Sequence, residues 1–356
     1  MNPTRELQAT GQSLWLDNIT RGLLNDGVLA NYIKDLSVTG LTSNPTIFQK
    51  AIAGTDLYDS AIDQKTRDGK TGEALFFELA IEDLRRAADL FRPVHDATEG
   101  VDGWVSLEVS PLLASDTTKT IKAAADLHAR ADRPNLFIKI PGTHAGLAAI
   151  EESIFNGVPV NVTLLFSREH YSAAANAYMK GVERRLAAGL DPKVRSVASL
   201  FVSRWDAAVQ DEVAPNLQNR LGIAIAQSTY KAYRELLASP RWQALADAGA
   251  VPQRLLWAST GTKDPEASDT LYLQALAAPD TINTIPGKTL LAFADHGQVR
   301  GVLSDDGDDY QSVLDQFEDA GIDRDALAAR LQVEGAKSFE DSWNGLLERI
   351  ASKSGA

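Results

Sequence analysis

The sequence predicts an α/β barrel of eight parallel strands, a (β/α)8 or TIM barrel, with additional N-terminal and C-terminal helices. Short apolar runs rich in β-branched residues alternate with stretches whose apolar residues recur at helical spacing. This alternation occurs eight times, and polar residues collect where the predicted strands end. A strand followed by a helix, repeated eight times, is the pattern of such a barrel, and its chemistry lies at the carboxyl ends of the strands.

The predicted strands are short and are separated by enough residues for a crossover helix, which parallel neighbours require. They are Ser13–Asp17, Ser37–Thr42, Trp104–Val109, Leu136–Ile140, Val158–Leu164, Val197–Val202, Leu255–Ser259 and Thr281–Ile285. Helical spacing between them is clearest over Glu73–Phe91, Arg168–Leu186 and Asn219–Leu237.

We interpret residues 1–356 as one barrel domain, with the barrel at about 13–300 and a helical extension at about 306–353. The extension is expected to pack on the outside of the barrel. No low-complexity linker, solenoid-length repeat or block of like charges marks a domain boundary. An extra helical stretch, Pro240–Ala246, is compatible with a lid, a subunit contact or simple packing.

Composition argues against several classes of protein. Hydrophobic residues make up 44% of the chain and charged residues 23%, which is ordinary for a globular protein. The net charge of −13 argues against a nucleic-acid partner, because phosphate backbones would be repelled. No apolar run approaches the roughly 18 residues of a membrane span. The first residues lack the apolar core of a secretory signal, so we expect a cytoplasmic protein.

Residue types that hold metals and cofactors are missing or scattered. The chain has no cysteine, which excludes disulfides, thiolate nucleophiles and cysteine-ligated metals. No glycine-rich nucleotide-binding motif follows a predicted strand. The histidines lack the spacing of a metal site; they are His95, His128, His144, His170 and His296. We therefore expect neither a metal nor an organic cofactor.

A lone lysine inside an apolar strand is the most informative feature of the sequence. Lys139 lies within Leu136–Ile140, where an ammonium group would lose most of its hydration. Burial disfavours the charged form of a lysine, and the neutral amine can attack a carbonyl to form a Schiff base. Asp17 and Glu108, on the first and third strands, could move the protons that this chemistry requires.

The alternative for Lys139 is a structural ion pair with one of these carboxylates. Neutral hydrogen-bonding residues at the other strand ends favour chemistry instead, because they suit a polyhydroxylated substrate such as a sugar. These residues are Asn44, Asn161, Thr163 and Ser199. Each one alone could be a satisfied structural hydrogen bond, so the prediction depends on the whole set.

A phosphate site is predicted where the seventh strand ends. Ala258–Lys263 combines hydroxyls, a glycine and a lysine, and includes Ser259. Arg204, just past the sixth strand, could supply a planar guanidinium. The alternative is a hydroxyl-rich turn with a surface lysine, but loops after late barrel strands are frequent phosphate sites.

Two longer motifs resemble the transaldolase family. Gly40–Phe48 resembles its first signature, and Phe137–Leu147 resembles the second, which surrounds the Schiff-base lysine. The resemblance extends from about Leu14 to Pro286. It implies transfer of a dihydroxyacetone unit from sedoheptulose 7-phosphate or fructose 6-phosphate to glyceraldehyde 3-phosphate or erythrose 4-phosphate, in the non-oxidative pentose phosphate pathway.

The resemblance also implies roles for the residues at the strand ends. Lys139 forms the imine, Asp17 takes the proton from the C4 hydroxyl of the donor, and Glu108 acts through a water held by Thr163. The implied substrate-binding residues are Asn44, Asn161, Ser199 and Phe201 for the sugar, and Arg204 and Ser259 for the phosphate.

One position departs from the family pattern. Gly261 stands where many members carry a second phosphate-binding arginine, and Lys263 follows two residues later. We expect Lys263 to substitute as a point charge without the bidentate geometry of arginine.

Two other functions stay open. A second branch of the family performs simple aldol cleavage and addition with free dihydroxyacetone, in the manner of a fructose 6-phosphate aldolase. That branch lacks the glutamate on the third strand and carries a tyrosine on the sixth, where this chain has Glu108 and Phe201. A non-catalytic sugar-phosphate-binding barrel is the other function, although binding needs no buried amine. A monomer and a homodimer are equally compatible with the sequence.

Overall fold

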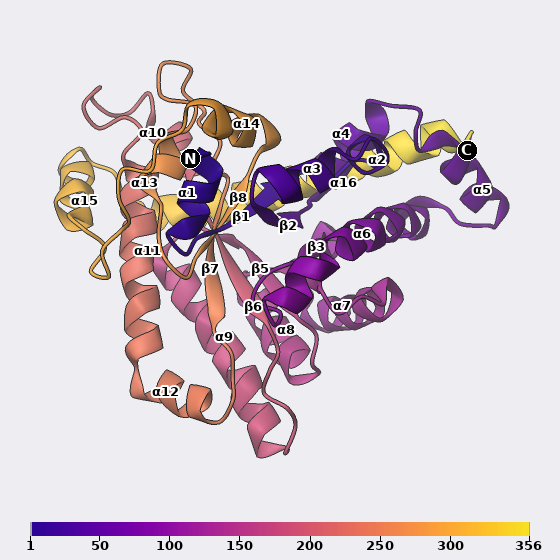
Figure 1. Cartoon of the computed structure of the whole chain (residues 1–356), viewed down its shortest axis with the longest axis horizontal. Coiled ribbons are helices and arrows are strands. Elements are labelled where there is room, and N and C mark those ends of the chain that lie inside the picture. The colour runs from indigo at the N-terminus through magenta and orange to yellow at the C-terminus, as the bar shows by residue number, and fades with distance from the viewer. Residues whose placement is uncertain (1, 356) are drawn as a thin grey trace.

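The computed structural model describes residues 2–355, and within them an eight-stranded parallel sheet curls into a barrel surrounded by helices (Figure 1). Its strands are β1 (Ser13–Asp17), β2 (Val38–Thr42), β3 (Val105–Glu108), β4 (Leu136–Pro141), β5 (Val160–Leu165), β6 (Ser196–Phe201), β7 (Gln253–Ala258) and β8 (Ile282–Ile285). Their order in the sheet is β2-β1-β8-β7-β6-β5-β4-β3. The predicted barrel is confirmed. The first and last residues of each predicted strand lie within two residues of the boundaries in the structure.

Several helices begin at a capping residue that follows a strand directly. Asn44, Thr143 and Ser167 cap α4, α8 and α9, because each side chain accepts a hydrogen bond from the backbone N–H three residues later. The helices are α1 (Pro3–Ala9), α2 (Arg21–Asn25), α3 (Val28–Asp35), α4 (Pro45–Ala53), α5 (Asp59–Arg67), α6 (Gly72–Ala97), α7 (Thr117–Ala131), α8 (His144–Phe155), α9 (Arg168–Ala187), α10 (Ser203–Val209), α11 (Leu221–Ala238), α12 (Pro240–Asp247), α13 (Leu271–Ala275), α14 (Gly287–His296), α15 (Tyr310–Asp319) and α16 (Arg324–Ser354), with a 3-10 turn η1 (Pro111–Leu113).

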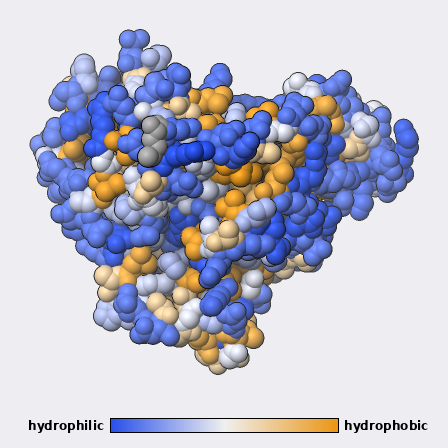
Figure 2. Space-filling view, viewed as in Figure 1, coloured by the Kyte–Doolittle hydropathy of each residue, from blue (hydrophilic) through white to orange (hydrophobic). Residues whose placement is uncertain are grey.

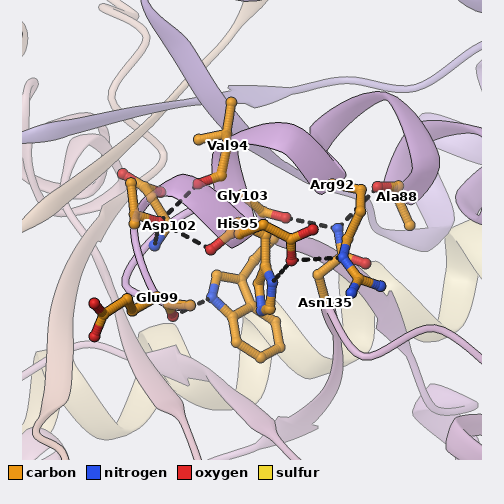
Figure 3. A network of polar contacts seen from close by, with 12 residues as sticks. Ala88, Arg92, Val94, His95, Glu99, Asp102, Gly103 and Asn135 are labelled. Atoms are coloured by element: carbon orange, nitrogen blue, oxygen red, sulfur yellow. Dashed lines mark hydrogen bonds and ion pairs between the residues drawn. The ribbon is translucent and has the colours of Figure 1, made fainter.

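The barrel closes between β2 and β3 through a backbone bridge from Gly40 to Trp104. A Cβ atom on Gly40 would lie 2.7 Å from the Trp104 carbonyl oxygen and 2.7 Å from the Trp15 ring, so a glycine is required there. Asn135 Nδ2 donates to the Gly103 carbonyl at 2.8 Å and supports the same seam (Figure 3).

The strands are almost completely covered by the surrounding helices and loops. Apart from Asp17, every residue of the eight strands is buried. Buried polar side chains need a hydrogen-bond partner or another compensating role. The polar residues in these strands are therefore either parts of structural networks or parts of a functional site.

The C-terminal extension differs from our expectation. Helix α15 packs against α11 on the outside, but α16, drawn in yellow in Figure 1, packs against α4 and the end of β5. The amide of Gln332 on α16 donates to the Leu164 carbonyl at 2.9 Å. Helix α16 thus crosses the carboxyl ends of the strands. Its apolar stripe required a partner surface, and the spacing of that stripe did not specify which surface.

The face of the molecule in Figure 2 is mostly hydrophilic, with hydrophobic residues gathered toward its middle. None of the helices between residues 2 and 355 combines the length and the apolar character that crossing a membrane requires.

Candidate active site

A cavity of about 310 Å³ lies at the carboxyl ends of the strands. The predicted site residues that line it are Asp17, Asn44, Lys139, Thr163, Ser199, Phe201, Arg204, Ser259 and Lys263. The other two, Glu108 and Asn161, are buried directly behind the wall and contact Lys139 and Ser199. The structure therefore brings all the predicted site residues together.

A wider hollow of about 890 Å³ lies at the opposite end of the barrel. It contains none of the predicted site residues, and its Arg234 is paired with Asp280 and Asp305 at 2.9 and 3.0 Å. We assign the site to the smaller cavity because the carboxylates and the amine occur together there.

Lys139 is 5% exposed and has two polar contacts within the barrel. Its Nζ donates to the Ser43 carbonyl at 3.1 Å and lies 3.3 Å from Glu108 Oε2. The register of the sheet explains the placement, because Lys139 pairs with Glu108 on β3 and with Asn161 on β5. The ion pair that we considered as the structural alternative is therefore present. It also places a proton acceptor beside the amine, so it does not argue against catalysis.

Glu108 is a buried carboxylate whose ion-pair partner within residues 2–355 is Lys139. Neither of its oxygens has a hydrogen-bond partner of good geometry among the described residues. Burial raises the pKa of Glu108, and the positive charge of Lys139 offsets part of that effect. A carboxyl group with a raised pKa is better suited than an ordinary glutamate to accept a proton from a neighbouring group and to return it.

Asp17 ends β1 on the cavity wall. Thr42 Oγ1 donates to Asp17 Oδ1 at 2.8 Å and also lies 2.6 Å from Thr284 Oγ1. Burial raises the pKa of Asp17, against opposing contributions from Lys139, the Thr42 hydrogen bond and Lys263. The site therefore holds two carboxylates with raised pKa values on different strands.

The neutral polar residues form a short chain of hydrogen bonds beside Lys139. Ser199 Oγ donates to Asn161 Oδ1 at 2.7 Å, and Asn161 Nδ2 donates to Ser106 Oγ at 3.2 Å. Thr163 differs, because its buried hydroxyl has no partner among the described residues. Asn44 accepts from the Ile47 N–H at 3.0 Å with its oxygen. Its amide nitrogen and the Thr163 hydroxyl can therefore bind a substrate or a water.

Three cationic side chains line one part of the cavity without a carboxylate partner. Within residues 2–355, the structure gives no ion pair to Arg204, Lys263 or Lys50. Partial burial lowers the pKa of Lys263, with further lowering by Arg204 and Lys50, while Asp17 opposes the shift. Like charges that repel one another in a cavity are expected where an anion binds.

The backbone beside this cationic group is also distinctive. Ser259 has a φ of 56°, in the left-handed region, and its Oγ lies 2.9 Å from Ser203 Oγ. The Arg204 guanidinium lies 5.6 Å from the centre of the Phe201 ring. Hydroxyls, a guanidinium and two lysines together match the chemistry of a phosphate.

Lys50 and Phe339 line the cavity but were absent from the sequence prediction. Lys50 carried a usable signal, because Thr46, Ile47 and Lys50 share one face of the helix that begins at Pro45. Phe339 carried none, because it belongs to α16, far along the chain.

In the part of the chain that the structure describes, no group of three or more His, Asp or Glu side chains is arranged to hold a metal ion. The acids of the cavity are instead placed for contact with an amine and with hydroxyls.

A comparison with known proteins assigns the chain to a family. The family model described as transaldolase/fructose-6-phosphate aldolase matches residues 14–350. The chain belongs to this family. It is 48% identical to a transaldolase of Frankia alni over 364 aligned residues, which cover 99% of this chain and 98% of that protein. Transaldolases of Thermobifida fusca and Thiobacillus denitrificans are each 45% identical to it, over 98% of this chain and 98% and 100% of their own lengths.

In this member of the transaldolase/fructose-6-phosphate aldolase family, the two sequence motifs meet in space. Gly40–Phe48 runs from β2 into α4, and Phe137–Leu147 runs from β4 into α8. Lys139 of the second motif donates to the Ser43 carbonyl of the first at 3.1 Å. The motifs therefore build one wall of the cavity around the lysine.

Proposed function

We propose that the protein is a transaldolase, which transfers a dihydroxyacetone unit between sugar phosphates through a Schiff base on Lys139. One observation carries the proposal: a buried lysine amine lies 3.3 Å from Glu108, in a cavity that Asp17 also lines. The similar proteins named transaldolase support the same activity. A barrel that only binds sugar phosphates would not need a buried amine.

Imine formation uses Lys139, Glu108 and Thr163. Lys139 passes a proton to Glu108, and the neutral amine attacks the C2 carbonyl of the donor ketose. The carbonyl oxygen takes up this proton and a second proton that the attacking nitrogen releases, both by way of Glu108, and leaves as water while the C=N bond forms. Thr163 holds the water through which Glu108 exchanges protons, since its hydroxyl has no partner in the described chain.

Carbon–carbon cleavage uses Asp17. Asp17 takes the proton of the C4 hydroxyl, the C3–C4 bond breaks, and its electron pair moves toward the imine nitrogen. An aldose phosphate leaves, and a three-carbon enamine stays on Lys139. Addition of the acceptor aldehyde re-forms the bond, Asp17 returns its proton, and hydrolysis releases the new ketose phosphate.

The remaining cavity residues would bind the substrate. Asn44, Asn161 and Ser199 would contact the sugar hydroxyls beside Phe201. Arg204, Ser259 and Lys263 would hold the phosphate, with Lys50 as an additional cation. The carboxyl group of Glu108 and the apolar ring of Phe201 favour transfer over the simple aldolase reaction of the family's second branch.

Reductive trapping tests this proposal. The protein is incubated with fructose 6-phosphate and borohydride, and the modified peptide is identified by mass spectrometry. We expect a three-carbon adduct on Lys139. A folded protein that leaves Lys139 unmodified and the sugar intact would overturn the proposal.

A parallel reaction with erythrose 4-phosphate separates the two branches. Formation of sedoheptulose 7-phosphate indicates transfer, whereas release of free dihydroxyacetone alone indicates the aldolase. A cytoplasmic location and a monomeric or homodimeric state are further proposals, which cell fractionation and sedimentation measure directly.

A further inference from the structure

Helix α16 carries a glutamine, Gln332, whose side chain contacts the ends of β4 and β5 from outside the cavity. Gln332, Gly335 and Phe339 follow one another at helical spacing on the side of α16 that faces the barrel. Phe339 reaches the cavity, whereas the amide of Gln332 donates hydrogen bonds to two backbone carbonyls. The role proposed for Gln332 rests on the proposed Schiff-base function.

The amide of Gln332 joins the ends of two neighbouring strands. Its Nε2 donates to the Leu164 carbonyl at 2.9 Å and to the Gly142 carbonyl at 3.3 Å. Gly142 in turn donates its N–H to the Thr163 carbonyl at 2.7 Å. These three hydrogen bonds form a closed ring around the ends of β4, which carries Lys139, and β5, which carries Thr163.

The backbone within this ring is strained. Leu164 has a φ of 59°, in the left-handed region, where a leucine is disfavoured by roughly 1–2 kcal/mol. The pairing of β5 with β6 also shifts register between Val162 and Leu165. Such a conformation persists only where surrounding contacts hold it, and strained residues of this kind cluster at functional sites.

Helix α16 is shaped to accommodate Leu164. The Leu164 side chain is buried, and a Cβ atom on Gly335 would lie 3.1 Å from its Cδ2 and 3.3 Å from the Phe166 ring. Gly335 thus allows the helix to approach closely enough for Gln332 to reach the two carbonyls.

We propose that Gln332 is a positioning residue for the Schiff-base reaction. By holding Leu164 in the left-handed conformation, it fixes the adjacent Thr163 hydroxyl relative to Lys139. Thr163 is sensitive to this control because its hydroxyl is buried without a partner in the described chain, so no hydrogen bond of its own holds it in place. A displacement of about 1 Å in a catalytic group can reduce turnover about a hundredfold.

The test begins with Gln332→Ala. We expect kcat for transfer from fructose 6-phosphate to erythrose 4-phosphate to fall roughly ten- to a hundredfold, with KM changed less than about twofold. Val333→Ala on the same helix is the matched control, because Val333 is 70% exposed, and it should leave both constants unchanged. A melting curve for each variant reports whether it is folded.

A double-mutant cycle separates positioning from simple packing. Glycine adopts the left-handed conformation without strain, so Gln332→Ala should reduce kcat several-fold less in a Leu164→Gly background than in the wild-type background. Leu164→Asn provides a second background that also tolerates this conformation if the glycine variant does not fold.

Equal losses in both backgrounds, or a raised KM with unchanged kcat, would overturn the positioning role alone. A wild-type protein that forms no Lys139 adduct and performs no transfer would instead overturn the proposed function and the role of Gln332 with it. The wild-type trapping reaction therefore distinguishes the two failures.

Discussion

The two ends of the barrel are formed by the same strands but differ in how their polar groups are satisfied. At the amino end, Asp102 accepts hydrogen bonds from Ser13 and from Trp15 Nε1, the latter at 2.6 Å. Arg254 donates to Ser13 Oγ at 2.8 Å and to three backbone carbonyls. Figure 3 shows Asp102 within this region. The buried side-chain atoms without partners near these strand starts are amide oxygens, those of Gln12, Asn135 and Gln253, as far as residues 2–355 show.

At the carboxyl end, the unpartnered groups include those of Glu108 and Thr163, which we propose to act in proton transfer. Both oxygens of Glu108 and the hydroxyls of Ser110 and Thr163 have no hydrogen-bond partner among the described residues. The cationic group of Lys50, Arg204 and Lys263 has no ion pair in the same part of the chain.

From this difference we predict that the polar groups at the amino end stabilise the barrel and that those at the carboxyl end bind substrate or move protons. A buried polar group without a partner destabilises the fold by about 1–3 kcal/mol, so such groups are rare unless they have another role. Glu108 contacts Lys139 and Thr163 lines the cavity, at the end where barrel enzymes carry their sites, which favours a functional explanation over a packing defect for these two residues. Substitutions at the carboxyl end should therefore lower turnover, whereas substitutions at the amino end should lower the free energy of unfolding and leave turnover nearly unchanged.

Lys139→Ala should have the largest effect. Removal of the amine should lower kcat by roughly 10⁴-fold or more, because Lys139 is the cavity lysine that lies beside the proton acceptor Glu108. Turnover is measured by coupled assay, and binding of fructose 6-phosphate by calorimetry. Binding should be largely retained, since the phosphate and hydroxyl contacts stay in place. Turnover near the wild-type level would refute the assignment of the carboxyl end as the reactive end.

Glu108→Gln should lower turnover and should change how the stability of the protein depends on pH. The loss of proton transfer should reduce kcat roughly 10²- to 10⁴-fold. Burial raises the pKa of folded Glu108 above its unfolded value, so the folded state binds the proton more tightly. Native stability contributed by this group then falls as pH rises through the raised pKa.

The melting temperature of Glu108→Gln relative to wild type should therefore increase from acid to alkaline pH, because only the wild type must bury this carboxylate charge. Loss of the Lys139 partner adds an offset that lowers the stability of the variant. Melting curves of both proteins across this pH range provide the measurement. A difference that stays constant or decreases as pH rises would contradict the raised pKa of Glu108.

Asp102→Ala, at the amino end, should lower the stability of the protein without lowering its turnover. Ser13 and Trp15 would lose their shared acceptor, and the Ser13 hydroxyl that accepts from Arg254 would lose its own partner, so the free energy of unfolding should fall by about 2–4 kcal/mol. Denaturant titration measures this loss. The kcat of the folded fraction should stay within about twofold of wild type. Asp126→Ala on the surface of α7 is the control and should change neither property. A loss of kcat like that of Glu108→Gln would contradict the division between the two ends.

Sequence reasoning predicted the fold and most of the cavity for a physical reason. Strand–helix alternation is local, and residues that end parallel strands share one edge of the sheet, so Asp17, Lys139 and Thr163 had to meet. The paths of segments outside this repeat do not follow from local pattern. Helix α16 was expected on the outside, and its contacts through Gln332 and Phe339 come from tertiary packing.

The position of Lys50 could be predicted from the sequence only in part. Its place on the same helical face as Thr46 and Ile47 could have been derived from the cap at Asn44. Its membership of a cationic group could not, because Arg204 and Lys263 approach from other parts of the chain. The roles of all these side chains in catalysis and binding stay predictions.

The smallest effects should come from this cationic group. Lys263→Ala and Lys50→Ala should each raise KM for fructose 6-phosphate roughly tenfold with little change in kcat, because each removes one charge from the bound phosphate. Steady-state kinetics at low and high salt are the measurement. The wild-type KM should rise with ionic strength more steeply than that of either variant, since screening weakens exposed charges. Lys122→Ala, whose side chain is exposed on α7, is the matched control.

The two lysines need not contribute equally. Burial lowers the pKa of Lys263, and the charges of Arg204 and Lys50 lower it further, so Lys263 should lose its proton at a lower pH than an ordinary lysine. Its contribution to binding should then decline as pH rises, so that KM of the Lys50→Ala variant, which keeps Lys263, should increase at alkaline pH. A wild-type KM for Lys263→Ala would mean that Arg204 and Lys50 suffice, and that Lys263 does not replace the second arginine of the family pattern.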